Sequence, residues 1–136
     1  ITLMFVDAKA DKLGAAVAGG TVYKGGEGGT QTNLIKVSTN IDGALRLESD
    51  IERTATHEIG HSGGLSHPWE VQNNTHEATV KQGLASDETV RTNVMNSGAN
   101  PEVKNRYVPG GGIKATEANA GQLMQIVESI ETDLNK

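Results

Sequence analysis

The chain has 136 residues, of which 35% are hydrophobic and 3% aromatic, so it suits one domain with a modest core rather than two domains. Its net charge of −5, with Lys and Arg scattered along the chain, argues against a nucleic-acid partner. No apolar run approaches the length of a membrane span. Cysteine is absent, which excludes disulfides and thiolate metal ligands. We expect a monomer without a membrane span.

The first forty residues are typical of a sheet. Residues 11–18 permit either a short helix or a loop, and the glycine-rich segment 25–30 lacks the G-K-[ST] ending of a phosphate loop. Ile35 and Val37 alternate with polar residues and therefore share one strand face. We predict strands at residues 1–7, which we expect to be buried, at residues 21–24, and at residues 33–39.

A helix is predicted over residues 50–62. Ser49 followed three residues later by Glu52 forms a capping-box pattern at its start. The spacing of the apolar residues predicts a core face made of Ile51, Ala55 and Ile59.

The end of this helix carries the pattern H-E-x-x-H-x-x-G-x-x-H, formed by His57, Glu58, His61, Gly64 and His67. Two histidines four residues apart lie on one helix face and can aim their ring nitrogens at one point. Gly64 permits the positive φ that turns a chain at a helix end, so His67 can return as a third ligand. Three protein ligands leave one tetrahedral position of a zinc ion open for catalysis.

Glu58 lies beside that point but is poorly placed to be another ligand on the same face. Its carboxylate can instead take a proton from an attacking water molecule, as a general base. An isolated H-x-x-x-H pair is often only a polar helix face. Here all five positions match, and they use three of the four histidines in the chain, so we predict a zinc site.

The second half of the chain is predicted to be rich in loops. A polar segment follows His67, with one short helix near residues 86–92, and residues 96–112 are typical of a loop. Thr116 is expected to cap a final helix. The apolar residues of that helix recur at helical spacing and predict a scaffold element: Leu123, Ile126, Val127, Ile130 and Leu134.

The stretch from His57 to His67 resembles the extended zinc-binding motif of the metzincin clan of zinc endopeptidases. The resemblance implies a methionine turn downstream, for which Met95 is the candidate, lying beneath the metal as an apolar floor. Ser97 stands where some members place a tyrosine, so the chain is closer to matrixin-like members. Tyr107 is expected to line a pocket or to pack on the surface.

The resemblance implies an α+β fold with a small mixed sheet, an active-site helix and a C-terminal helix. It divides one catalytic domain, residues 1–136, into an upper part of about residues 1–64 and a lower part of about residues 65–136. The implied activity is zinc-dependent hydrolysis of peptide bonds in a secreted or extracytoplasmic setting. We expect an extended protein or peptide substrate along an edge strand, for which residues 21–24 are the candidate.

The start of the chain departs from the clan, whose catalytic domains usually open with another strand, a long helix and a further strand. The chain is therefore expected to be a minimal variant or a fragment, and a sheet without that helix would expose one apolar face. Two alternatives to a free-standing peptidase follow. One is a zinc-retaining module that is inactive, and the other is the peptidase domain of a larger secreted or toxin-like protein.

Overall fold

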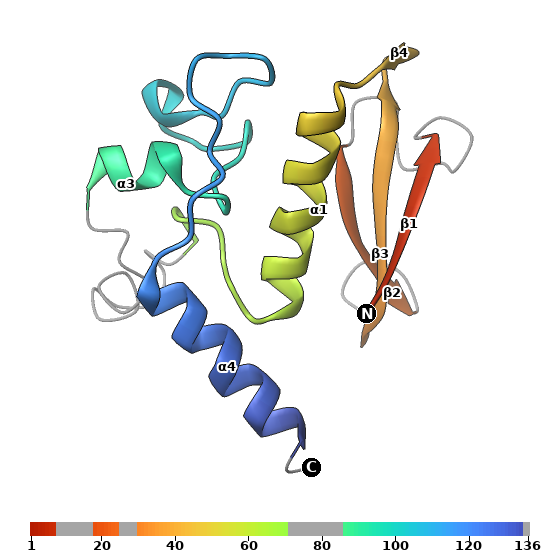
Figure 1. Cartoon of the computed structure of the whole chain (residues 1–136), viewed down its shortest axis with the longest axis vertical. Coiled ribbons are helices and arrows are strands. Elements are labelled where there is room, and N and C mark those ends of the chain that lie inside the picture. The colour runs from red at the N-terminus through yellow and green to blue at the C-terminus, as the bar shows by residue number, and fades with distance from the viewer. Residues whose placement is uncertain (8–17, 25–29, 71–85, 135–136) are drawn as a thin grey trace. The chain divides into compact units, whose positions relative to one another are not determined.

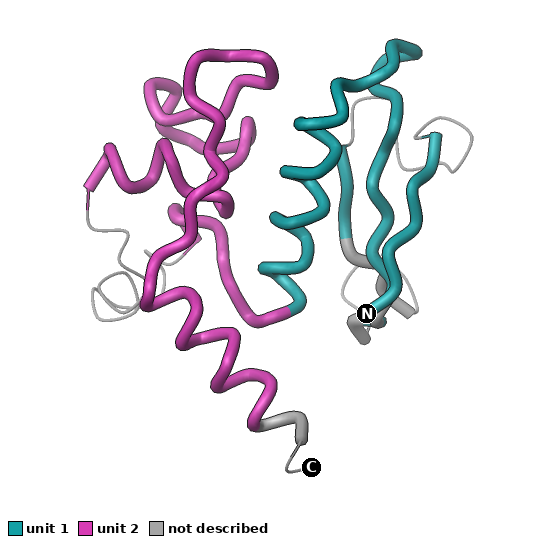
Figure 2. The backbone as a smooth tube through the Cα atoms, in the orientation of Figure 1, with its two compact units in different colours: residues 1–62 teal, residues 63–136 magenta. Residues whose placement is uncertain are grey.

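The computed structural model describes residues 1–7, 18–24, 30–70 and 86–134 (Figure 1). Most of the segments 11–18 and 25–30, for which a helix or loop and a glycine-rich loop were expected, lie outside the described residues. The chain forms two compact units, Ile1–Ser62 and Gly63–Lys136 (Figure 2). None of the described helices is long and apolar enough to cross a membrane.

The first unit contains a mixed sheet, so the predicted α+β class is confirmed. Its strands are β1 (Thr2–Asp7), β2 (Gly19–Lys24), β3 (Thr30–Ile41) and β4 (Ala44–Leu45). β3 is central: β1 pairs with it in parallel, β2 pairs with it antiparallel, and β4 returns along its end as a short hairpin. Gly43, with φ of 80°, supplies the left-handed conformation in that hairpin turn.

The expectation that residues 1–7 are buried was wrong. β1 lies at an edge of the described sheet, where Met4 is 42% exposed and Phe5 57% exposed. The reason is that the helix described in this unit, Glu48–Ser62, packs against β3 and β2. The alternation of the central strand was interpreted correctly, since Ile35 and Val37 are fully buried.

Helix α1 (Glu48–Ser62) covers this sheet (Figure 1). Ile51 and Ala55 pack on the cluster formed by Ile35 and Val37, as predicted. Ile59 does not, being 39% exposed. Seven residues make about two helical turns, so the residue that continues the face of Ile51 is Glu58.

The predicted capping box at Ser49 was also wrong, because the helix begins one residue before it. The carbonyl of Leu47 already accepts from the backbone N–H groups of Asp50 and Ile51, at 3.0 and 3.1 Å. Ser49 is therefore inside the first turn, where its side chain cannot serve as the N-cap.

Arg46 joins three elements of this unit. Its guanidinium donates to the carbonyls of Ala18 (3.2 Å), Ser38 (2.7 Å) and Asp50 (3.1 Å), and to Oγ1 of Thr54 (2.6 Å). The acceptors belong to the residue before β2, to β3 and to α1. A planar cation with a fixed fork of donors suits such divergent acceptors, and it holds the helix on the sheet.

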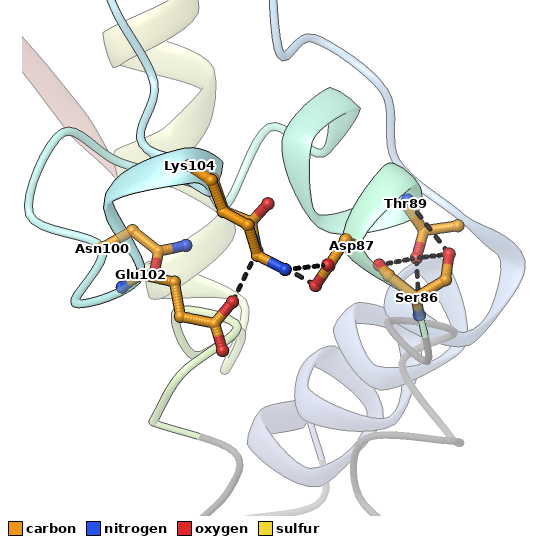
Figure 3. A network of polar contacts seen from close by, with 7 residues as sticks. Ser86, Asp87, Thr89, Asn100, Glu102 and Lys104 are labelled. Atoms are coloured by element: carbon orange, nitrogen blue, oxygen red, sulfur yellow. Dashed lines mark hydrogen bonds and ion pairs between the residues drawn. The ribbon is translucent and has the colours of Figure 1, made fainter.

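The second unit contains α3 (Asp87–Thr92), the 3-10 helix η2 (Val103–Asn105) and α4 (Ala120–Leu134). The short helix near residues 86–92 and the final helix are thus confirmed. Ser86 caps α3 in a reciprocal capping box with Thr89 (Figure 3).

An ion pair joins α3 to η2. Nζ of Lys104 lies 2.6 Å from Oδ2 of Asp87 (Figure 3), and the side-chain amide of Asn105 donates to the other oxygen of Asp87 at 3.1 Å. Both hydrogen bonds stabilise the charged carboxylate and lower the pKa of Asp87 below its usual value.

Thr116 does not cap the final helix. The cap is Asn119, whose Oδ1 accepts from the backbone N–H of Gln122 at 2.9 Å. Thr116 lies before the helix, next to Glu117, which forms a parallel bridge with Asn93. The scaffold role of α4 is only partly confirmed: Ile126 packs on the buried cluster of this unit, whereas three other apolar residues are exposed by 52–56%, namely Leu123, Val127 and Ile130.

Candidate metal centre

His57 and His61 lie on adjacent turns of α1, on the same face of the helix. Their Nε2 atoms lie 3.2 Å apart, and their rings meet edge to face, with centroids 4.8 Å apart. Two nitrogens bound tetrahedrally at about 2.0–2.1 Å to one zinc ion lie about 3.3–3.4 Å from each other. The separation of the two Nε2 atoms therefore fits one edge of such a tetrahedron.

His67 completes a group of three histidines. Each of the three offers one ring nitrogen, and these atoms all lie within 4.8 Å of one another. His57 is buried, while His61 and His67 are half-buried. These three residues could hold a metal ion, and imidazole nitrogen is a ligand that suits zinc, copper, iron and nickel.

Gly64 lies between the helix and the third histidine. The helix ends at Ser62, and Gly64 has φ of 89°. A Cβ atom built on Gly64 would meet its nearest neighbour only at 3.6 Å. Glycine is therefore favoured there by the backbone conformation rather than by lack of space.

Glu58 is 8% exposed and lies on the sheet side of α1. Its Cγ atom is 3.5 Å from the position that a Cβ of Gly19 would take at the start of β2. Burial raises the pKa of Glu58, and the nearby charges of His61 and Arg53 act in the opposite direction. A carboxylate whose pKa is raised accepts a proton more readily near neutral pH.

Met95 is fully buried in the second unit, in one cluster with Leu65 and Val94 and with Ile126 packed against it. Leu65 precedes His67 by two residues, so Met95 packs against the segment that leads to His67. At Ser97, Oγ accepts from the backbone N–H of Ala99 at 3.1 Å.

A buried pair of amides fixes the segment around Met95 to α4. Nδ2 of Asn93 donates to Oε1 of Gln122 at 2.7 Å, and Nε2 of Gln122 donates back to Oδ1 of Asn93 at 2.8 Å. The same Oδ1 accepts from the backbone N–H of Met95 at 2.9 Å. Two buried side chains thus satisfy each other and orient the backbone of the turn.

Two residues after the motif were not identified from the sequence. Glu70 contacts both the ring and the backbone of His67, and the indole of Trp69 stacks on the His67 ring. The only signal in the sequence was their position, two and three residues after His67. Tyr107 lines a cavity of about 320 Å³ in the second unit. None of the three histidines is among the residues that line it.

Comparison with protein-family models, with curated proteins and with solved structures finds no match to this chain. The chemistry of the site therefore has to be inferred from its own residues.

Proposed function

We propose that this chain is a zinc-dependent endopeptidase of metzincin type. The observation that carries the proposal is the 3.2 Å separation of the Nε2 atoms of His57 and His61, with the buried Glu58 next to His57 on the same helix. A purely structural zinc site is usually closed by four protein ligands. Among the described residues the group contains three.

In this proposal His57, His61 and His67 hold the ion. A bound zinc ion supplies Lewis acidity toward a peptide carbonyl and makes water more acidic. Glu58 accepts the proton of the attacking water and passes it to the leaving amine, a role that its raised pKa suits.

β2 supplies an edge on which a peptide substrate can lie. Within the described sheet it pairs with β3 alone, so its other edge can form main-chain hydrogen bonds with an added strand. β2 begins at Gly19, against which Glu58 packs. A peptide that extends this sheet therefore starts close to the proposed base. Main-chain recognition of this kind suits protein substrates of varied sequence. The secreted or extracytoplasmic setting is proposed from the family resemblance alone.

The test is the substitution Glu58→Gln, compared with Glu52→Gln, an exposed glutamate of the same helix. Both remove one negative charge, but only Glu58 is placed to accept the proton. We expect Glu58→Gln to retain about one zinc per chain and to lose casein hydrolysis by roughly 10²–10⁴-fold, while Glu52→Gln stays close to wild type.

Elemental analysis and casein hydrolysis are measured on the same preparations. Full hydrolysis by Glu58→Gln would exclude that residue as the base. A wild-type chain that holds zinc but cleaves nothing would indicate the inactive zinc-binding module instead.

A further inference from the structure

His67 is held differently from the other two histidines. His57 and His61 take their positions from the regular geometry of α1, whereas His67 follows the turn at Gly64 and belongs to no helix or strand. A ligand outside regular structure needs other contacts to fix its ring, because a free imidazole can rotate and can carry its proton on either nitrogen.

Glu70 makes such contacts. Its Oε1 lies 2.9 Å from Nδ1 of His67, and its Oε2 accepts from the backbone N–H of His67 at 3.0 Å. The backbone N–H of Glu70 in turn donates to the carbonyl of His67 at 3.1 Å. Residues 67–70 thus form a closed turn in which one carboxylate spans both the ring and the backbone of His67.

Trp69 fixes the plane of the same ring. The indole and the imidazole are stacked with centroids 4.5 Å apart and an angle of 4° between their planes. The stacking restrains the tilt of the ring, and the carboxylate restrains its rotation about the side chain.

The contact with Glu70 also selects one tautomer. A neutral imidazole has one N–H donor and one acceptor nitrogen. Oε1 of Glu70 lies 2.9 Å from Nδ1, although the ring N–H is not aligned with this oxygen as a hydrogen bond requires. A lone pair on Nδ1 would face the carboxylate at this short range, so the proton is favoured on Nδ1 and the lone pair on Nε2. Histidines that bind metals commonly donate their other ring N–H to a carboxylate, and loss of such a partner costs about 10–100-fold in metal affinity.

We propose that Glu70 is a positioning residue, which holds His67 in the Nδ1–H tautomer and presents Nε2 as a metal ligand, with Trp69 fixing the ring plane. This role rests on the proposed zinc site, but it does not depend on peptide hydrolysis. Glu70 acts only through His67 and contacts neither the ion nor a substrate.

The tautomer of His67 is tested first, in the wild-type chain without metal. Long-range ¹H–¹⁵N NMR spectra distinguish a protonated ring nitrogen from an unprotonated one. We expect a proton on Nδ1 and a lone pair on Nε2 of His67. The opposite tautomer would overturn the proposal without the need for any variant.

Zinc affinity is then compared between Glu70→Gln and Glu52→Gln. Each variant removes one negative charge, and Glu52 serves as the exposed control on α1. Trp69 is the one tryptophan of the chain, so its fluorescence reports metal binding at the ring it stacks on. Competition with a chromophoric chelator gives the dissociation constant.

We expect zinc binding to weaken about 10–100-fold in Glu70→Gln and to stay within about twofold of wild type in Glu52→Gln. Equal affinity in Glu70→Gln, with wild-type fluorescence on zinc binding, would overturn the role of Glu70 while the zinc site stands. A wild-type chain that binds no zinc would instead overturn the proposed function itself.

Discussion

Met95 is enclosed by apolar side chains and has no exposed surface, so its role is packing. We expect Met95→Leu to lower the free energy of unfolding by less than about 1.5 kcal/mol, because the change conserves volume and polarity. Met95→Asp should prevent stable folding, because it buries a charge without a partner. Urea denaturation checks both, and a Leu variant that kept its fold but lost zinc would instead point to contact between sulfur and metal.

Asp87 gives a prediction about pH. Its pKa is lowered by hydrogen bonds from Lys104 and Asn105. A carboxyl whose pKa is lower in the folded state adds stability above its unfolded pKa, and this contribution is lost as the pH falls through the folded pKa. We expect Lys104→Met to raise the pKa of Asp87, as followed by NMR titration of its carboxyl carbon. An unchanged pKa would show that the contact is not formed in solution.

The histidine group could be predicted from the sequence because its geometry is local. Helical spacing alone aims the ring nitrogens of His57 and His61 at one point, and Gly64 marks the turn that follows the helix. The environment of Glu58 could not be predicted in the same way. Its burial depends on the approach of β2, through Gly19, from a distant part of the sequence.

At the scale of elements, the contact between α1 and β2 depends on a glycine. A Cβ on Gly19 would lie 2.9 Å from Cγ2 of Thr54 and 3.0 Å from the carbonyl oxygen of Lys36, whereas a Cβ on Gly20 would meet nothing within 4 Å. We expect Gly19→Ala to destabilise the chain by about 1–3 kcal/mol through overpacking.

The neighbouring substitution Gly20→Ala is the matched control, with an expected change of at most about 1 kcal/mol. Urea denaturation of the two variants, read by circular dichroism, measures the difference. Equal stabilities would mean that the helix does not approach the strand as closely as the structure shows.

Helices and strands could be located from periodicity, but their ends and their burial could not. Both capping predictions failed although Ser49 and Thr116 are suitable cap residues. Leu47 already accepts the first hydrogen bonds of α1 ahead of Ser49, and Thr116 precedes a residue, Glu117, whose backbone pairs with Asn93 before the final helix begins. The burial of β1 was overestimated because an apolar run does not show whether a strand is central or at an edge. The position of a strand depends on which strands pair with it, and its burial depends on which strands the helix covers.

At the scale of the whole molecule, two properties oppose each other. A net charge of −5 keeps copies of the chain apart, whereas the exposed apolar residues of β1, an edge strand, favour association. At about 1 M salt the repulsion is screened beyond about 3 Å. We therefore expect the chain to self-associate at high ionic strength, and Phe5→Lys to reduce that association.

Val103→Lys is the control, because Val103 is 71% exposed on η2 and the substitution changes the net charge by the same amount. Sedimentation velocity at low and high salt separates the two variants. Equal association of wild type, Phe5→Lys and Val103→Lys would exclude β1 as the contact.

The hydrogen bonds of Arg46 have a consequence for the order in which the first unit forms. Its acceptors range from Ala18 to Thr54, so the complete set can exist only when β2, β3 and α1 have all assembled. Contacts that close such long loops contribute little before the folding barrier is crossed. Arg46 should therefore act mainly on the rate of unfolding. Its hydrogen bonds then determine how long the assembled sheet and helix stay together.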